Sequence, residues 1–131
     1  MRRILILFTL ALVLLTACGG AADEDPAASL CAALTELNAT GPQIAALGDV
    51  ADLAQIVQLG SAMDENWRSL AKAVDGMDEA TQTTFSSFDD KYDGIPAITQ
   101  ETEMAVARKS LDAKNTIITD TYNALYPENC P

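Results

Sequence analysis

The strongest constraint on the fold is an apolar stripe with helical spacing in the middle of the chain. Its members recur at intervals that alternate between three and four positions: Leu53, Ile56, Gly60, Met63, Trp67, Leu70 and Val74. This spacing keeps them on one narrow face of an α-helix, as in helices that pack lengthwise in bundles. Gly60 either lets a neighbouring helix approach closely or marks a bend. We expect a long helix that is capped by Asp49 and closed by Asp75-Gly76.

A second helix is expected before this stripe. Asp25 is suited to be its N-cap, and Pro26 to be its first helical residue. The helix should stop near residues 38–41, and its apolar positions are Leu30, Ala33, Leu34 and Leu37. A short helical turn over residues 42–48 then leads to the central helix.

Two more helices are expected after the central one. The first runs from about Asp78 to Tyr92, and its apolar face carries Thr81, Phe85, Phe88 and Tyr92. The second starts at Ala97 or Thr99 and ends at Leu125, before Pro127. Its apolar residues recur every seven positions, at Met104, Leu111, Ile118 and Leu125.

The chain shows no sustained alternation of apolar and polar residues, so strands are not expected. Four amphipathic helices with short connections predict an all-α fold, a small up-down four-helix bundle over residues 26–131. In this topology the start of the first helix and the end of the last helix lie at the same end of the bundle.

Residues 1–17 differ in character from the rest of the chain. Two arginines precede an apolar run of twelve residues, 4–15, and this run is too short for a membrane span of about 20 residues. Leu15-Thr16-Ala17-Cys18 completes a segment that resembles the signal peptide and lipobox of bacterial lipoproteins. The resemblance implies cleavage after Ala17 and diacylation of Cys18. The alternative is an ordinary signal peptide, with Cys18 an incidental thiol.

The same resemblance implies where the chain works. The mature chain would be extracytoplasmic and held to the bacterial membrane by lipid on Cys18, because two acyl chains anchor a protein stably. Residues 18–25 would form the lipidated cysteine and a short linker before the helical domain. Gly19 follows the cysteine where many inner-membrane lipoproteins carry aspartate. Outer-membrane sorting is therefore expected if the host has two membranes.

Two cysteines, Cys31 and Cys130, remain once Cys18 is assigned to lipid. In an exported protein an even remainder indicates a disulfide. The bridge would close nearly the whole domain, and the bundle topology brings the two ends together. The alternatives are two free buried thiols or a metal pair, although two cysteines without a histidine make a poor zinc site.

The charge of the chain is strongly acidic. Removing Arg2 and Arg3 from its eight basic residues leaves six against 19 acidic residues, a formal net charge of −13. A protein that binds nucleic acid needs a basic face, so no nucleic-acid partner is expected. The same charge opposes contact with anionic lipid headgroups, which leaves the lipid on Cys18 as the membrane attachment.

The segment Asp89-Asp90-Lys91-Tyr92-Asp93-Gly94 has some features of a calcium loop. Counted from Asp89, an aspartate and a glycine stand at the fifth and sixth positions. However, Lys91 occupies the third position and Gln100 the twelfth, where ligands belong. An acidic helix end followed by a turn is the expected structure, and no metal site is predicted.

Catalytic groups are not indicated either. The chain has no histidine, which excludes histidine-activated nucleophiles and histidine metal sites. The carboxylate pairs Asp64-Glu65 and Asp78-Glu79 are adjacent in sequence, and neighbours on a helix point in different directions. We therefore expect neither an enzyme nor a cofactor.

The aromatic residues lie on the helical stripes, where core packing is expected. They are Trp67, Phe85, Phe88, Tyr92 and Tyr122, and the alternative is that they line a cavity for an apolar ligand. The sequence thus favours a cell-envelope lipoprotein that acts by binding another protein or as a scaffold. Binding of a small apolar or cationic ligand is the second hypothesis, and no particular ligand-binding residue is indicated.

Overall fold

The structure is a computed structural model that describes residues 25–131. These residues form five α-helices and no strand, with the bounds α1 Pro26–Asn38, α2 Thr40–Leu47, α3 Leu53–Val74, α4 Glu79–Asp93 and α5 Met104–Asn129. The predicted signal peptide, Cys18 and the linker as far as Glu24 lie outside the described residues.

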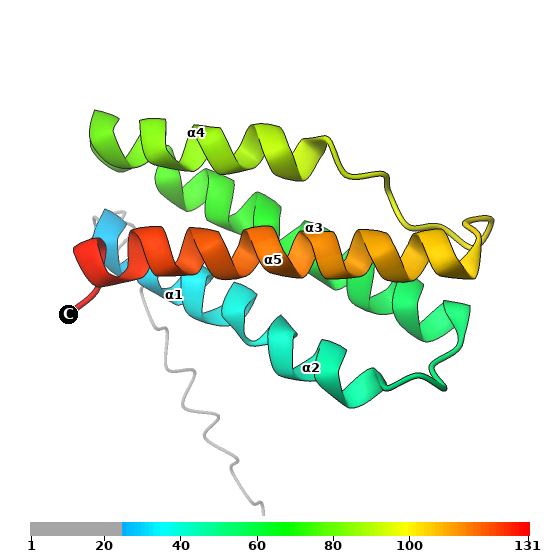
Figure 1. The fold of residues 1–131 in the computed structure, drawn as a ribbon. Helices are drawn as coiled ribbons and strands as arrows, with labels where there is room; N and C mark the ends of the chain where they lie inside the picture. The colour runs from blue at the N-terminus through cyan, green and yellow to red at the C-terminus, as the bar shows by residue number, and fades with distance from the viewer. Residues whose placement is uncertain (1–24) are drawn as a thin grey trace, which may run out of the picture.

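The helices run up and down as predicted (Figure 1). α1 and α2 follow each other with only Ala39 between them, and together they form one side of the bundle. α3 then runs back, α4 reverses the direction again, and α5 returns to the end where α1 begins. The described residues therefore confirm the all-α, up-down four-helix bundle, in which α2 extends α1.

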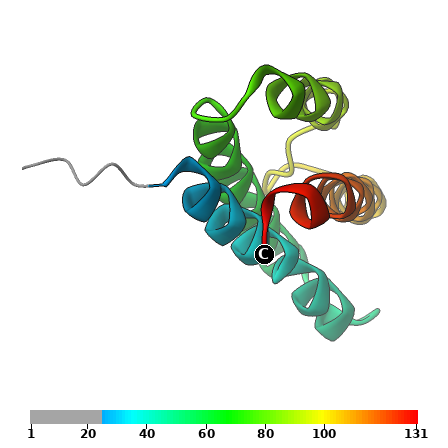
Figure 2. The ribbon, with the colours of Figure 1, turned by 90° about the vertical axis from the view of Figure 1, so that its left-hand side faces the viewer.

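α3 and α5 are the central pair of the bundle (Figure 2). They pack against each other, and each of them also contacts α1 and α4. The core lies between these helices and is formed by their predicted apolar faces. Its largest fully buried apolar side chains are Leu30, Leu34, Leu37, Ile56, Met63, Leu70 and Ile118.

Side-chain caps set the start of three helices. The Asp25 carboxylate accepts a hydrogen bond from the backbone N–H of Ala27 at 3.1 Å, which confirms it as the N-cap of α1. Asp78 caps α4 by accepting from the N–H of Thr81 at 2.8 Å, and this bond lowers the pKa of Asp78. Such bonds satisfy N–H groups that have no partner inside the helix.

The predicted cap of α3 was wrong. Asp52, and not Asp49, is its N-cap, and it accepts from the N–H of Gln55 at 2.9 Å. The Gln55 side chain in turn accepts from the N–H of Asp52 at 3.0 Å, which completes a capping box. Asp49 has no glutamine or glutamate three positions later, so it cannot form this reciprocal pair.

Both predicted ends of the last helix were also wrong. α5 begins at Met104, because Ile98 is buried in the core and Thr99 and Thr102 form a hydrogen-bonded turn before the helix. At the other end the helix continues through Pro127 to Asn129. Proline removes one backbone donor, but Cys130 N–H still bonds to Tyr126 and extends the last turn.

The absence of a side chain at position 60 is explained by the connection between α4 and α5. A neighbouring helix does not account for it. A Cβ atom at this position would lie 3.1 Å from Cδ1 of Ile98, which is closer than ordinary van der Waals contact. Ile98 lies in the connection over residues 94–103 and is 7% exposed. The missing side chain at Gly60 thus makes room for Ile98.

The predicted disulfide is present. Cys31 near the start of α1 and Cys130 directly after α5 are bonded, with their Cα atoms 5.7 Å apart and 99 positions apart in sequence. It joins the beginning and the end of the described bundle, as the up-down topology requires.

Candidate functional site

The acidic segment at residues 89–94 is the end of α4 and the residue that follows it. The Asp89 carboxylate accepts a hydrogen bond from the indole Nε1 of Trp67 at 2.7 Å. Within residues 25–131 no group of three or more acidic or cysteine side chains has an arrangement that could hold a metal ion.

A buried cluster of polar residues, which the sequence reasoning missed, connects α3, α4 and α5. Lys114 of α5 is only 3% exposed, and its ammonium forms an ion pair with the Asp64 carboxylate of α3. The sequence contains one indication that Lys114 is buried. Lys114 lies three positions after Leu111 and four before Ile118, which places it on the buried stripe of its helix.

Tyr92 of α4 completes the cluster. Its hydroxyl donates to the Asp64 carboxylate at 2.9 Å, and its ring stacks on Trp67 with the ring centroids 4.1 Å apart and the planes at 3°. The Lys114 Nζ lies 4.2 Å from the centroid of the same ring, within range of a cation–π interaction. Asp64 therefore accepts from both Lys114 and Tyr92.

The environment keeps Tyr92 in its neutral, hydrogen-bond-donating form. Burial raises the pKa of Tyr92 most strongly, and the hydrogen bond to Asp64 and the charge of Asp64 raise it further. The positive charge of Arg68 opposes the increase in the pKa.

A pocket of about 250 Å³ opens beside this cluster, and we call it the Lys114 pocket. It is lined by Asp64, Trp67, Tyr92 and Lys114 of the cluster and by Ile95 and Ala97 of the α4–α5 connection. Arg68 and Asp93, both exposed, also line it. Charged groups of both signs and an aromatic surface thus meet in one small space.

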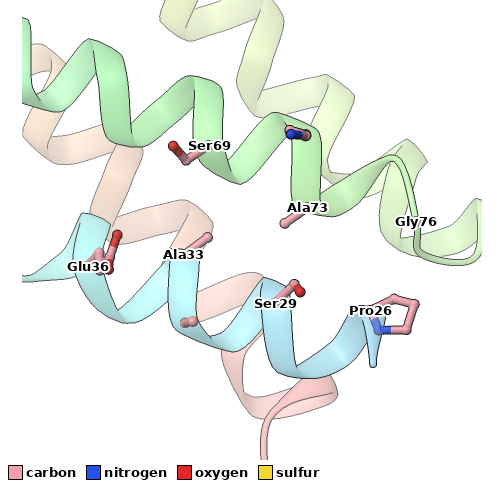
Figure 3. Close-up of a pocket in the computed structure, with 9 residues that line it drawn as sticks. Pro26, Ser29, Ala33, Glu36, Ser69, Ala73 and Gly76 are labelled. Carbon is pink, nitrogen blue, oxygen red and sulfur yellow. The ribbon is translucent and has the colours of Figure 1, made fainter. Parts of the chain in front are cut away.

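Two larger pockets are open grooves on the surface. The first, of about 490 Å³, lies between α1 and α3 (Figure 3). Small side chains such as Ser29, Ala33 and Ala73 line it. The second, of about 460 Å³, lies between α2 and α3 and is lined largely by exposed glutamines and alanines. Glu36 and Lys72 also line the first groove, but neither groove contains a buried ion pair or an aromatic side chain like those of the Lys114 pocket.

The connection between α2 and α3 is held in place by one side chain. The guanidinium of Arg108 in α5 donates to three backbone carbonyls of this connection, those of Gly48 at 3.1 Å and of Asp49 and Ala51 at 3.0 Å. Gly48 has a φ of 60°, which favours glycine at that position. Val50 lies between the bonded residues and is 95% exposed.

Two further exposed apolar residues, Met104 and Val106, belong to the first turn of α5. The start of α5 and the start of α3 lie at the same end of the bundle, opposite the disulfide (Figure 1). We call this the distal end. Met104 is 36% exposed although it belongs to the predicted stripe of α5.

The predicted aromatic core is confirmed for three residues. Trp67, Phe85 and Tyr92 are buried, and the Trp67 ring also lies 5.3 Å from that of Phe85. Phe88 and Tyr122 are half-buried at the edge of the core, and Tyr122 stacks on Tyr126. Of these residues, only Trp67 and Tyr92 line the Lys114 pocket.

None of the helices in the described part of the chain is long and apolar enough to cross a membrane. Comparisons with protein-family models, with curated proteins and with solved structures found no match.

Proposed function

We propose that this chain is an extracytoplasmic lipoprotein, anchored through lipid on Cys18, that binds another envelope protein with the distal end of its bundle. The observation that carries the proposal is Val50, which is almost fully exposed on a connection that Arg108 holds by three hydrogen bonds. Met104 and Val106, the other two exposed large apolar side chains of residues 25–131, belong to the same end of the bundle, and a grouping of exposed apolar side chains is typical of a protein–protein contact.

The geometry of the two ends supports this arrangement. Seven residues separate Cys18 from Pro26, where α1 begins next to the disulfide. α5 has 26 residues, so the distal end lies about 39 Å from the disulfide end at 1.5 Å per helical residue. A bundle tethered at its N-terminus would therefore present the distal end farthest from the membrane.

The charge of the distal end indicates the chemistry of the partner. Asp49, Asp52, Glu101 and Glu103 are exposed in the connections next to Val50 and Met104. A complementary surface would have an apolar depression for the aliphatic side chains and basic residues around it. Complete burial of Val50 would contribute on the order of 1.5 kcal/mol.

The proposal can be tested in intact cells that produce the full chain with a photo-reactive phenylalanine at one position. Position 50 probes the distal end, and Ser86, exposed on α4, provides the control position. We expect a discrete cross-linked product from position 50 and none from position 86. A Met104→Asp substitution should weaken the product from position 50. Equal cross-linking at both positions would contradict a distal binding surface.

The anchor is measured in the same cells by labelling with a palmitate analogue. We expect the label on the wild-type chain and its loss in the Cys18→Ala variant, together with release of the chain from membranes. A wild-type chain that carries no label would show that the anchor is absent, and labelling that persists in the variant would show that the lipid is not on Cys18. Cross-linking at position 50 is scored separately, so the two parts of the proposal are tested independently.

A further inference from the structure

The Lys114 pocket has hydrogen-bonding capacity that the protein does not use. An ammonium group has three N–H donors, and the Lys114 ammonium has one hydrogen-bond acceptor among residues 25–131, the Asp64 carboxylate. The Tyr92 ring covers a second side of the ammonium at 4.2 Å. Lys114 lines the pocket although it is only 3% exposed, so a ligand would reach its remaining donors from the pocket side.

Two more charged groups at the pocket are without partners in the described residues. Arg68 and Asp93 line the pocket, and neither forms an ion pair or a side-chain hydrogen bond with another residue of 25–131. They come from two different helices, α3 and the last residue of α4. The pocket therefore offers one cation and one anion that are not committed elsewhere, beside the buried ion pair.

The balance of charges decides which ligands the pocket favours. Lys114 and Arg68 are positive, whereas Asp64 and Asp93 are negative, so the pocket has no net charge. A simple anion would meet both carboxylates in a chain whose net charge is −11, and a simple cation would meet both basic groups. A small molecule that carries charges of both signs can pair with both, and a volume of about 250 Å³ limits its size.

We propose that the Lys114 pocket binds a small zwitterion of the amino-acid class. The ligand carboxylate accepts hydrogen bonds from Lys114 and Arg68, and its ammonium group pairs with Asp93. The side chains of Ile95 and Ala97, which line the same pocket, pack against the ligand's carbon atoms. This site lies apart from the distal end, so the inference does not depend on the proposed function.

The chain contains its own reporter for this binding. Trp67 is the single tryptophan of the sequence and lines the pocket, so the tryptophan fluorescence of the protein reports this site. Alanine, propionate and ethylamine form a matched set of probes, because the second lacks the ammonium group of alanine and the third lacks its carboxylate. The titrations use the full chain purified in detergent.

We expect alanine to change the Trp67 emission in a saturable manner, and propionate and ethylamine to act at least about tenfold more weakly, as the loss of one charged hydrogen bond predicts. No saturable response to alanine would overturn the proposal, because the pocket would then contain solvent only. A response to propionate as strong as that to alanine would also overturn it, since the site would then be a simple anion site.

Matched surface variants test the assigned residues without disturbing the buried ion pair. Arg68→Gln and Asp93→Asn should each weaken alanine binding about tenfold or more. Lys72→Gln on α3 and Asp90→Asn on α4 remove the same charges from exposed residues outside the pocket and should leave binding unchanged. Equal affinities of the test and control variants would contradict the proposed contacts. Circular dichroism verifies that all four variants are folded.

Discussion

Lys114 occupies a position on α5 where the helical spacing favours an apolar side chain. A buried ammonium is costly unless its charge is paired and its donors are satisfied. Here the Asp64 carboxylate pairs with the charge and the Tyr92 ring covers one side of the ammonium, and Tyr92 also donates to the same carboxylate. Three helices thus contribute to one ion pair, which makes the pair dependent on the correct arrangement of all three.

Removing one member of this pair should destabilise the fold more than removing both. Lys114→Met leaves the half-buried Asp64 carboxylate without its counter-ion and should lower the free energy of unfolding by about 3 kcal/mol. The double variant Lys114→Met, Asp64→Leu should recover much of this loss, because no unpaired charge remains. Urea denaturation measures both values. A single variant as stable as the wild type would show that the pair is not coupled to folding.

At the scale of the elements, the capping box of α3 distinguishes two aspartates that are three residues apart. Asp52→Ala removes a side-chain acceptor at the helix start and should cost about 1 kcal/mol of stability. Asp49→Ala should have little effect, because its contact with Arg108 uses the backbone carbonyl and is retained. Thermal unfolding of the two variants provides the comparison. A larger loss of stability for Asp49→Ala than for Asp52→Ala would contradict the assignment of Asp52 as the N-cap.

The periodicity of the sequence predicted which helices exist, whereas their bounds depended on longer-range contacts. The stripe from Leu53 to Val74 corresponds to α3 because 3.6-residue spacing is a local property. The start of α5 was misplaced because Ile98 fits against Gly60, thirty-eight positions away. No local pattern marks this contact. Pro127 was taken as a stop, although its helix continues for two more residues.

The candidate site was predictable only in part. Trp67, Phe85 and Tyr92 were correctly placed in the core by their spacing, whereas Phe88 and Tyr122 lie at its edge. The ion pair between Asp64 and Lys114 joins residues 50 positions apart, and charged residues are usually expected at the surface. The position of Lys114 between Leu111 and Ile118 on the buried face of its helix was the local sign of this ion pair.

For the whole molecule, the disulfide should provide a large share of the stability. It closes a loop of about 100 residues, and restriction of the unfolded chain by such a loop contributes about 4–5 kcal/mol. Replacement of both Cys31 and Cys130 by alanine should lower the urea midpoint accordingly, and treatment of the wild type with a reductant should reproduce the shift. Cys18→Ala provides the control. An unchanged midpoint in the double variant would show that the bundle does not depend on the bridge.

The same bridge also determines how the molecule carries mechanical load. A pull between residue 25 and the α2–α3 connection would act first along α1 and α2. Cys31 lies within α1 and is bonded to Cys130, directly after α5, and Arg108 of α5 is hydrogen-bonded to that connection. Tension therefore divides between two parallel paths, one along α1 and α2 and the other along α5. The disulfide at one end and the Arg108 guanidinium at the other would let the bundle resist stretching as a unit.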